Sequence, residues 1–111
     1  MARVEVDTNE VRVRFSPAEK VLGLVGDLTV PRSAVRSAHL ITSWREVRGW
    51  RVGLGVPRRR MVGTWRWRGH RQLVSLERGL PAVGLELTGA RYDEVLVSTP
   101  EAERVRRLLE E

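Results

Sequence analysis

Short stretches in which apolar and polar residues alternate run through almost the whole of this chain. Val4 and Val6 fall on one face near the start. Comparable stretches cover residues 11–15, 28–30, 35–42, 62–68, 71–77, 83–88 and 95–97. A period of two is typical of half-buried β-strands, because successive side chains of a strand point to opposite faces. The pattern predicts a mainly β (α+β) domain with about seven to eight strands.

Two segments interrupt the alternation with helix-start signals. Segment 16–19 (Ser-Pro-Ala-Glu) combines a capping hydroxyl with a proline at the first helical position, and the glycines at 23 and 26 end that helix within about two turns. Segment 99–100 (Thr-Pro) repeats the signal near the C-terminus. It is followed by one apolar stripe formed by Ala102, Val105, Leu108 and Leu109. A helix with a single apolar stripe must lie on another element, and we expect the sheet to be that element.

Glycine-bearing segments mark the connections between strands. By its spacing, Gly69-His70 is predicted as the two-residue turn of an antiparallel hairpin. Segment 48–60 (RGWRVGLGVPRRR) has no helical period and too many glycines for a regular strand, so it is predicted as a long loop. Long loops in compact domains are usually functional or disordered, and the apolar residues of this one argue against disorder.

This order of elements predicts one domain over residues 1–111. It would be a strongly bent antiparallel sheet or half-barrel, capped by the C-terminal amphipathic helix. The order resembles the pleckstrin-homology-like (PH-like) superfold. Segments 30–35 (VPRSAV), 48–53 (RGWRVG) and 85–93 (LELTGARYD) resemble segments of small actinobacterial proteins of this kind, over residues 11–110. The resemblance implies a scaffold often used in adaptor roles. It departs at Arg58, where the family pattern often has glycine.

Composition excludes several classes of protein. The chain has no cysteine, which rules out disulfides, thiolate nucleophiles, iron–sulfur clusters and cysteine zinc sites. No apolar run approaches the roughly 18 residues of a transmembrane helix. The first residues have neither the basic nor the apolar region of a signal peptide. We therefore expect a cytoplasmic protein.

Positive charge is concentrated in the middle of the chain. The net charge is +6, and segment 32–78 contains twelve arginines and only two acidic residues, Glu46 and Glu77, a local net charge of +10. The remaining residues carry −4. Such asymmetry indicates a surface for an anionic partner, although arginine enrichment also follows from a GC-rich genome.

Few residues carry catalytic or metal-binding signals. His39 and His70 have no partner at metal-ligand or nucleophile–base spacing, so both are interpreted as structural or solvated histidines. Asp93 and Glu94 are adjacent and would point to opposite faces of a strand, which disfavours paired acid–base work. Gly53-Leu54-Gly55 lacks the rest of a dinucleotide or P-loop fingerprint. No metal, cofactor or small-molecule substrate is expected, and we predict that the chain is not an enzyme.

All four tryptophans lie between positions 44 and 67 and are interleaved with arginines. Trp65 and Trp67 share one face of a strand and are predicted to pack in the core. Trp44 and Trp50 lie beside or within the predicted loop, where core packing and partner binding are equally open.

The functional prediction centres on that loop. Tryptophan and arginine are enriched at interface hot spots, and three consecutive arginines resist burial. The predicted partner-binding residues are Arg48, Trp50, Arg51, Arg58, Arg59 and Arg60. We expect a non-enzymatic binding or scaffold module that binds a protein partner or a second copy of itself. The alternative is electrostatic binding to nucleic acid or to an anionic membrane surface.

Overall fold

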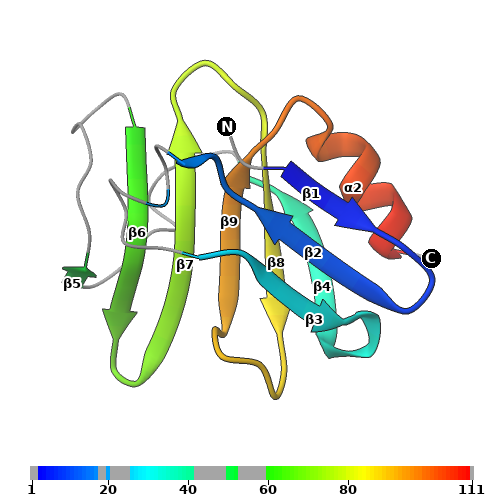
Figure 1. The fold of residues 1–111 in the computed structure, drawn as a ribbon, viewed down its shortest axis with the longest axis horizontal. Helices are drawn as coiled ribbons and strands as arrows, with labels where there is room; N and C mark the ends of the chain where they lie inside the picture. The colour runs from blue at the N-terminus through cyan, green and yellow to red at the C-terminus, as the bar shows by residue number, and fades with distance from the viewer. Residues whose placement is uncertain (1–2, 18–19, 21–25, 42–49, 53–59, 111) are drawn as a thin grey trace.

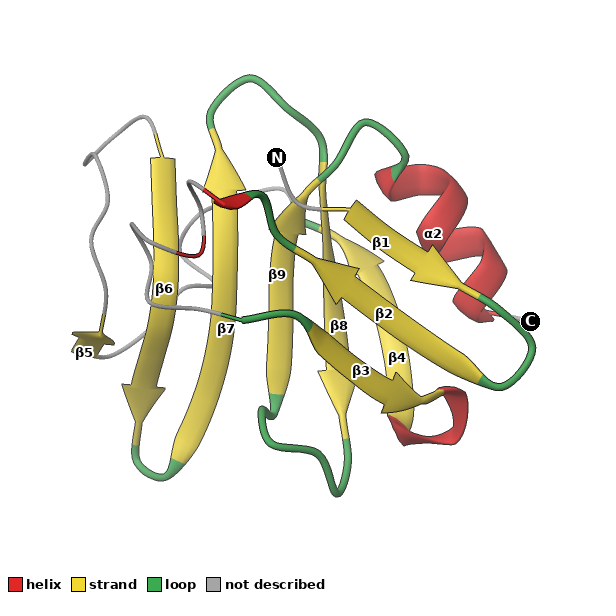
Figure 2. Ribbon diagram, viewed as in Figure 1, coloured by secondary structure: helices red, strands yellow, loops and turns green. Residues whose placement is uncertain are grey.

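The computed structural model describes residues 3–17, 20, 26–41, 50–52 and 60–110. These residues form nine strands, a short 3₁₀ helix and a C-terminal α-helix (Figure 1, Figure 2). In chain order the elements are β1 (Arg3–Val6), β2 (Glu10–Arg14), β3 (Leu28–Pro31), η1 (Arg32–Ala34), β4 (Val35–Leu40), β5 (Trp50–Val52), β6 (Arg60–Trp67), β7 (His70–Glu77), β8 (Ala82–Leu87), β9 (Glu94–Ser98) and α2 (Ala102–Glu110). The described part of the chain is therefore mainly β with a C-terminal helix, as the alternation predicts.

The first three strands form an antiparallel sheet in the order β1-β2-β3. Its register places Val4 opposite Val13 and Val11 opposite Val30, so the alternating valines share one buried face. Asp7 closes the turn between β1 and β2, because its Oδ1 accepts hydrogen bonds from the backbone N–H groups of two following residues at 2.8 Å each. These two bonds lower the pKa of Asp7.

The other six strands form a second sheet in the order β4-β8-β9-β7-β6-β5. Four of its five strand pairs are antiparallel, but β7 and β9 run parallel, with Leu73 opposite Val95. The prediction of an entirely antiparallel sheet is therefore wrong at this pair. After β7 the chain forms the β8–β9 hairpin, and β9 inserts between β8 and β7 instead of continuing the meander outward. Alternation along each strand is the same in either arrangement.

The two sheets and the helix enclose the main hydrophobic core. Figure 1 shows the three-stranded sheet crossing in front of β9, β8 and β4, with α2 beside β1 and β4. Buried residues of both sheets meet Ala102 and Val105 of the helix in one cluster. Thr99 caps the helix, since its Oγ1 accepts a hydrogen bond from the Glu101 N–H at 3.3 Å. The predicted packing of the terminal helix on the sheet is confirmed.

The opposite face of the six-stranded sheet, here called the outer face, also contains buried apolar residues. They form a second cluster of Trp65, Val74, Leu76, Ala82 and Leu96. The predicted burial of Trp65 is confirmed, because only 6% of it is exposed. The same prediction is wrong for Trp67, which is 45% exposed. Both indoles lie on one face of β6, but Trp67 is the last residue of the strand.

Two predicted connections are corrected. The β6–β7 turn is Arg68-Gly69, with φ values of 47° and 82°, and His70 already belongs to β7 opposite Trp67. The predicted turn lies one residue too late. The turn formed is of type I′, which needs positive φ at both central positions. Within the predicted loop, Trp50–Val52 forms strand β5 and pairs with β6.

Other predictions are met only in part or lie outside the described residues. Of the early helix, Pro17 and Lys20 are described, and the Lys20 N–H donates to the Ser16 carbonyl at 3.0 Å. Pro31 is the last residue of β3, on the edge strand of its sheet, a position that tolerates proline. Within the described residues, no helix is long and apolar enough to cross a membrane.

Candidate functional site

The predicted partner-binding residues fall mostly outside what the structure describes. Arg48, Arg58 and Arg59 lie outside the described residues. Trp50 and Arg51 are in β5 and Arg60 begins β6, and for these three the described structure is that of the backbone. Trp50 pairs with Arg66 and Arg51 with Trp65. The described strand β5 of this segment therefore runs beside the end of β6, where the structure describes side chains in detail.

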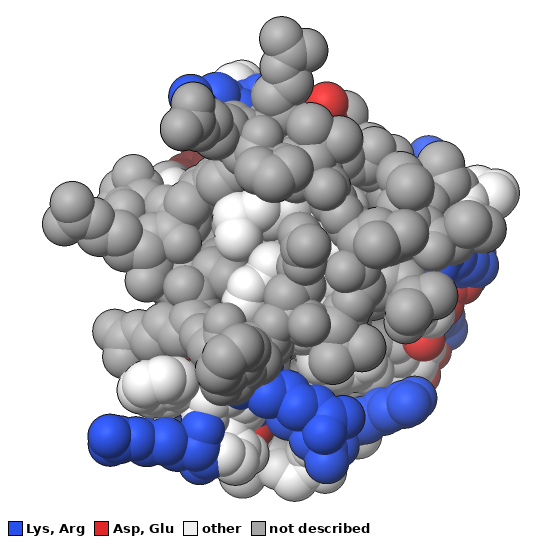
Figure 3. All heavy atoms as spheres, turned by 90° about the vertical axis from the view of Figure 1, so that its left-hand side faces the viewer, with Lys and Arg blue, Asp and Glu red and all other residues white. Residues whose placement is uncertain are grey.

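Exposed arginines gather where β6 turns into β7. Arg66, Arg68 and Arg71 are all exposed. Figure 3 shows blue side chains along the edge of the molecule at which this hairpin turns in Figure 1. Arg66 and Arg71 lie directly opposite each other across the hairpin, on one face of the sheet. No carboxylate of the described residues pairs with either guanidinium.

A cross-strand pair of like charges is unfavourable. Side chains directly opposite each other in an antiparallel pair have Cβ atoms about 4.5–5.5 Å apart, and like charges at that separation destabilise the hairpin. Elsewhere several described carboxylates pair with a nearby cation, among them Glu5 with Arg14 and Asp27 with Lys20. Hydrogen bonds from Phe15 N–H and Lys20 lower the pKa of Asp27, and one from Arg106 lowers the pKa of Glu103. The β6–β7 hairpin therefore has uncompensated positive charge.

The turn itself exposes an aromatic surface beside that charge. The guanidinium carbon of Arg68 lies 5.2 Å from the centroid of the Trp67 indole, within the range of a cation–π contact. Arg68 adopts φ 47°, a left-handed conformation that non-glycine residues rarely occupy. The half-exposed indole and the adjacent guanidinium together form a surface on which a planar group could stack.

Beside Trp67, the outer face of the six-stranded sheet is hollowed into a pocket of about 420 Å³. Its lining residues come from β4, β6, β7, β8, β9 and the β6–β7 turn: His39, Trp67, Arg68, His70, Gln72, Glu86 and Glu94. The strand register explains their meeting, because Gln72 lies opposite Glu94, and Glu94 lies opposite Glu86. We call this cavity the outer-face pocket.

Gly84 shapes one side of this pocket. A Cβ atom at Gly84 would lie 2.7 Å from Cε1 and 2.8 Å from Nε2 of His39, closer than real Cβ contacts allow. The imidazole of His39 therefore lies against the glycine backbone, on the same face as Glu86.

His70 is held between two carboxylates. Its Nε2 lies 2.5 Å from Glu94 Oε1, and its Nδ1 lies 4.0 Å from Asp93 Oδ2. The same Asp93 oxygen accepts a hydrogen bond from the Arg71 N–H at 2.8 Å. The prediction that Asp93 and Glu94 point to opposite faces of a strand is wrong, because Asp93 precedes β9 and both carboxylates approach one imidazole. Sequence spacing missed this cluster, since only the parallel β7–β9 pairing brings His70 to Glu94.

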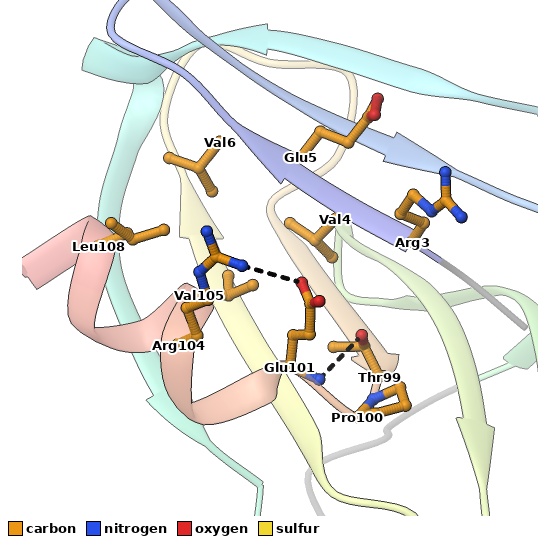
Figure 4. Close-up of a pocket in the computed structure, with 10 residues that line it drawn as sticks. All are labelled: Arg3, Val4, Glu5, Val6, Thr99, Pro100, Glu101, Arg104, Val105 and Leu108. Carbon is orange, nitrogen blue, oxygen red and sulfur yellow. Dashed lines mark hydrogen bonds and ion pairs between the residues drawn. The ribbon is translucent and has the colours of Figure 1, made fainter.

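A second concavity lies between β1 and α2 and measures about 590 Å³ (Figure 4). Val4, Val6 and Val105 line it, and Arg104 Nη1 lies 3.9 Å from Glu101 Oε2 at its rim. It is far from the β6–β7 hairpin in Figure 1.

The described residues contain no group of three or more histidine, aspartate or glutamate side chains placed to hold a metal ion. Comparisons of the chain with protein-family models, curated proteins and solved structures found no match. The candidate site consists of the β6–β7 hairpin end and the outer-face pocket that adjoins it.

Proposed function

We propose that this chain is a non-enzymatic binding module whose β6–β7 hairpin binds single-stranded nucleic acid. One observation carries the proposal: Arg66 and Arg71 face each other without an acidic partner among the described residues, next to the half-exposed Trp67. A phosphate between the two guanidinium groups would relieve their repulsion and accept charge-assisted hydrogen bonds from both. An unstacked base would lie on the indole, as bases do on aromatic side chains of single-strand binding proteins.

The chemistry of the hairpin favours a single strand over a duplex. In a duplex the base faces are stacked on one another and cannot reach an indole, whereas a single strand offers them freely. Arg68 sits in the turn between Trp67 on the outer face and Arg66 on the opposite face. A nucleotide chain crossing the turn could therefore place phosphates and a base on the two faces at once.

The curled sheets and the C-terminal helix support the further proposal of a PH-like fold, a scaffold compatible with many binding functions. The parallel β7–β9 pair departs from the antiparallel sheet that this fold proposal implies. A cytoplasmic location is also proposed, because nucleic acid is abundant in that compartment.

A protein partner or self-association remains the second candidate, and one observation favours it. β5 is an edge strand of the described six-stranded sheet, and edge strands can pair with another chain. If this candidate is right, size-exclusion chromatography with light scattering will report a dimer, or a partner will be recovered through residues 48–60. A monomer that binds oligonucleotide in the same buffer contradicts it.

The nucleic-acid proposal is tested by fluorescence anisotropy with a labelled oligothymidylate of about 12 nucleotides, within the usual site size. Between about 50 and 200 mM salt, the logarithm of affinity should fall with a slope of about −0.7 per phosphate contact. The double variant Arg66→Gln/Arg71→Gln should bind more weakly and should lose about 1.4 from the magnitude of that slope. Trp67→Ala should lose at least about fivefold in affinity, the lower end of one stacked base.

The matched control is Arg104→Gln/Arg107→Gln on α2, which removes the same charge from two exposed positions at the other end of the molecule. Its affinity and salt slope should stay close to those of the native chain. Equal losses in the two double variants would mean that net charge alone drives binding, and the proposed site would be wrong.

A further inference from the structure

The outer-face pocket contains a second cross-strand pair of like charges, this time acidic. Glu86 of β8 lies directly opposite Glu94 of β9 on the outer face. His70 holds one oxygen of Glu94, but no described side chain pairs with the Glu86 carboxylate. As for the arginines, opposed like charges are unfavourable unless a third group lies between them. The pocket therefore offers the carboxylate of Glu86 as an acceptor for which the described residues supply no donor.

Its size and walls restrict what that donor can be. About 420 Å³ is within the range of small-molecule sites. Trp67 contributes an indole, Gln72 an amide that is only 2% exposed, and His39 an imidazole held over Gly84. Planar side chains on several sides suit a flat ligand better than a flexible chain.

The positive charge of Arg68 favours a neutral ligand over a cationic one. Its guanidinium also lines the pocket, so a cationic ligand attracted by Glu86 and Glu94 would be repelled by this third group. A neutral ligand that combines donors with acceptors suits both kinds of charge. Among the nucleobases, guanine presents two adjacent N–H donors on its pairing edge, and its O6 and N7 accept from arginine.

We propose that the outer-face pocket binds a guanine base of the single strand and so gives the site its base preference. This rests on the proposed function. Glu86 accepts from N1–H and N2–H of the base, and Arg68 donates to its O6 or N7. Adenine would place the lone pair of its N1 against the carboxylate and leave Arg68 without an O6 acceptor. Adenine therefore lacks the paired hydrogen bonds that guanine makes with Glu86, and this loss disfavours it.

The test compares oligothymidylates of equal length that contain one central guanine or one central adenine. The native chain should bind the guanine strand about thirtyfold more tightly, the middle of the range for one bidentate base contact. Glu86→Gln should bring the affinities for the guanine and adenine strands within about twofold of each other. Glu101→Gln, which removes the same charge from an exposed position on the other side of the molecule, should keep the preference.

A second arm separates this inference from the proposed function. Titration with guanosine monophosphate should shift the amide resonances of Gln72 and Gly84 more than adenosine monophosphate does, both in the native chain and in Arg66→Gln/Arg71→Gln. If oligothymidylate fails to bind while these shifts appear, the pocket assignment stands and the hairpin function fails. If oligonucleotides bind with no preference for guanine, or the two mononucleotides act alike, the pocket assignment is overturned.

Discussion

Replacing Arg68 by asparagine should stabilise the fold and weaken binding at the same time. Arg68 occupies the left-handed region with φ 47°, which costs a non-glycine residue about 1–2 kcal/mol. Asparagine tolerates that region, and Asn-Gly is the preferred sequence of this turn type. The substitution also removes the Arg68–Trp67 contact at 5.2 Å, which contributes about 0.5–1 kcal/mol at an exposed site. The expected net gain is about 0.5–1 kcal/mol.

For a domain of 111 residues, this gain corresponds to an increase in Tm of about 2–5 °C, which differential scanning calorimetry resolves. In the anisotropy assay, the same variant should bind oligonucleotide more weakly, because a guanidinium beside the stacking surface is lost. A stability gain with unchanged affinity would remove Arg68 from the binding surface. A lower Tm would mean that the contact with Trp67 outweighs the backbone strain, and the reasoning about the turn would be wrong.

Two other predictions concern the fold that supports the hairpin. Ser98 is buried, and its Oγ accepts a hydrogen bond from the Glu77 N–H at 2.8 Å. Ser98→Ala should therefore lower the free energy of unfolding, measured in urea, by about 1–3 kcal/mol. A decrease of less than a few tenths of a kcal/mol would show that water replaces the lost bond. The pKa of Asp7 is lowered in the folded state, so its carboxylate stabilises the fold above its ordinary pKa of 3.8, and that contribution is lost as the pH falls through the lower folded-state value. The Tm difference between the native chain and Asp7→Ala should therefore be full at neutral pH and vanish in strong acid; a difference that is constant with pH would contradict the assignment.

Periodicity identifies most of the strands and the C-terminal helix because those elements are amphipathic. It does not determine which strands are neighbours. Leu73 and Val95 alternate equally well in a meander and in the parallel β7–β9 arrangement, so the insertion of β9 could not be predicted. The outer-face pocket depends on that insertion, since Gln72, Glu94 and Glu86 become neighbours only when β9 lies between β7 and β8.

The arginine pair could have been found from the sequence with a better choice of turn. A two-residue turn at positions 68 and 69 forces Trp67 opposite His70 and therefore Arg66 opposite Arg71. A turn one residue later would instead pair Arg68 with Arg71, so the Arg66–Arg71 pair would not be predicted. The turn observed is of type I′, which needs two positive φ values and favours glycine second, whereas glycine first, as in Gly69-His70, suits type II′.

The exposure of Trp67 could not be predicted from alternation, which assigns it the same face as the buried Trp65. The two differ in their distance from the strand end. Residues 48, 58 and 59, which the sequence marks for partner binding, lie outside the described residues, so their role stays a prediction.

Mapping amide resonances while oligothymidylate is added tests the binding surface most directly. If the β6–β7 hairpin binds the strand, the largest shifts should fall at residues 66–71, and those of α2 should barely change. Shifts concentrated on α2 and β1, or spread evenly over all exposed arginines, would contradict the assignment of the hairpin as the binding site.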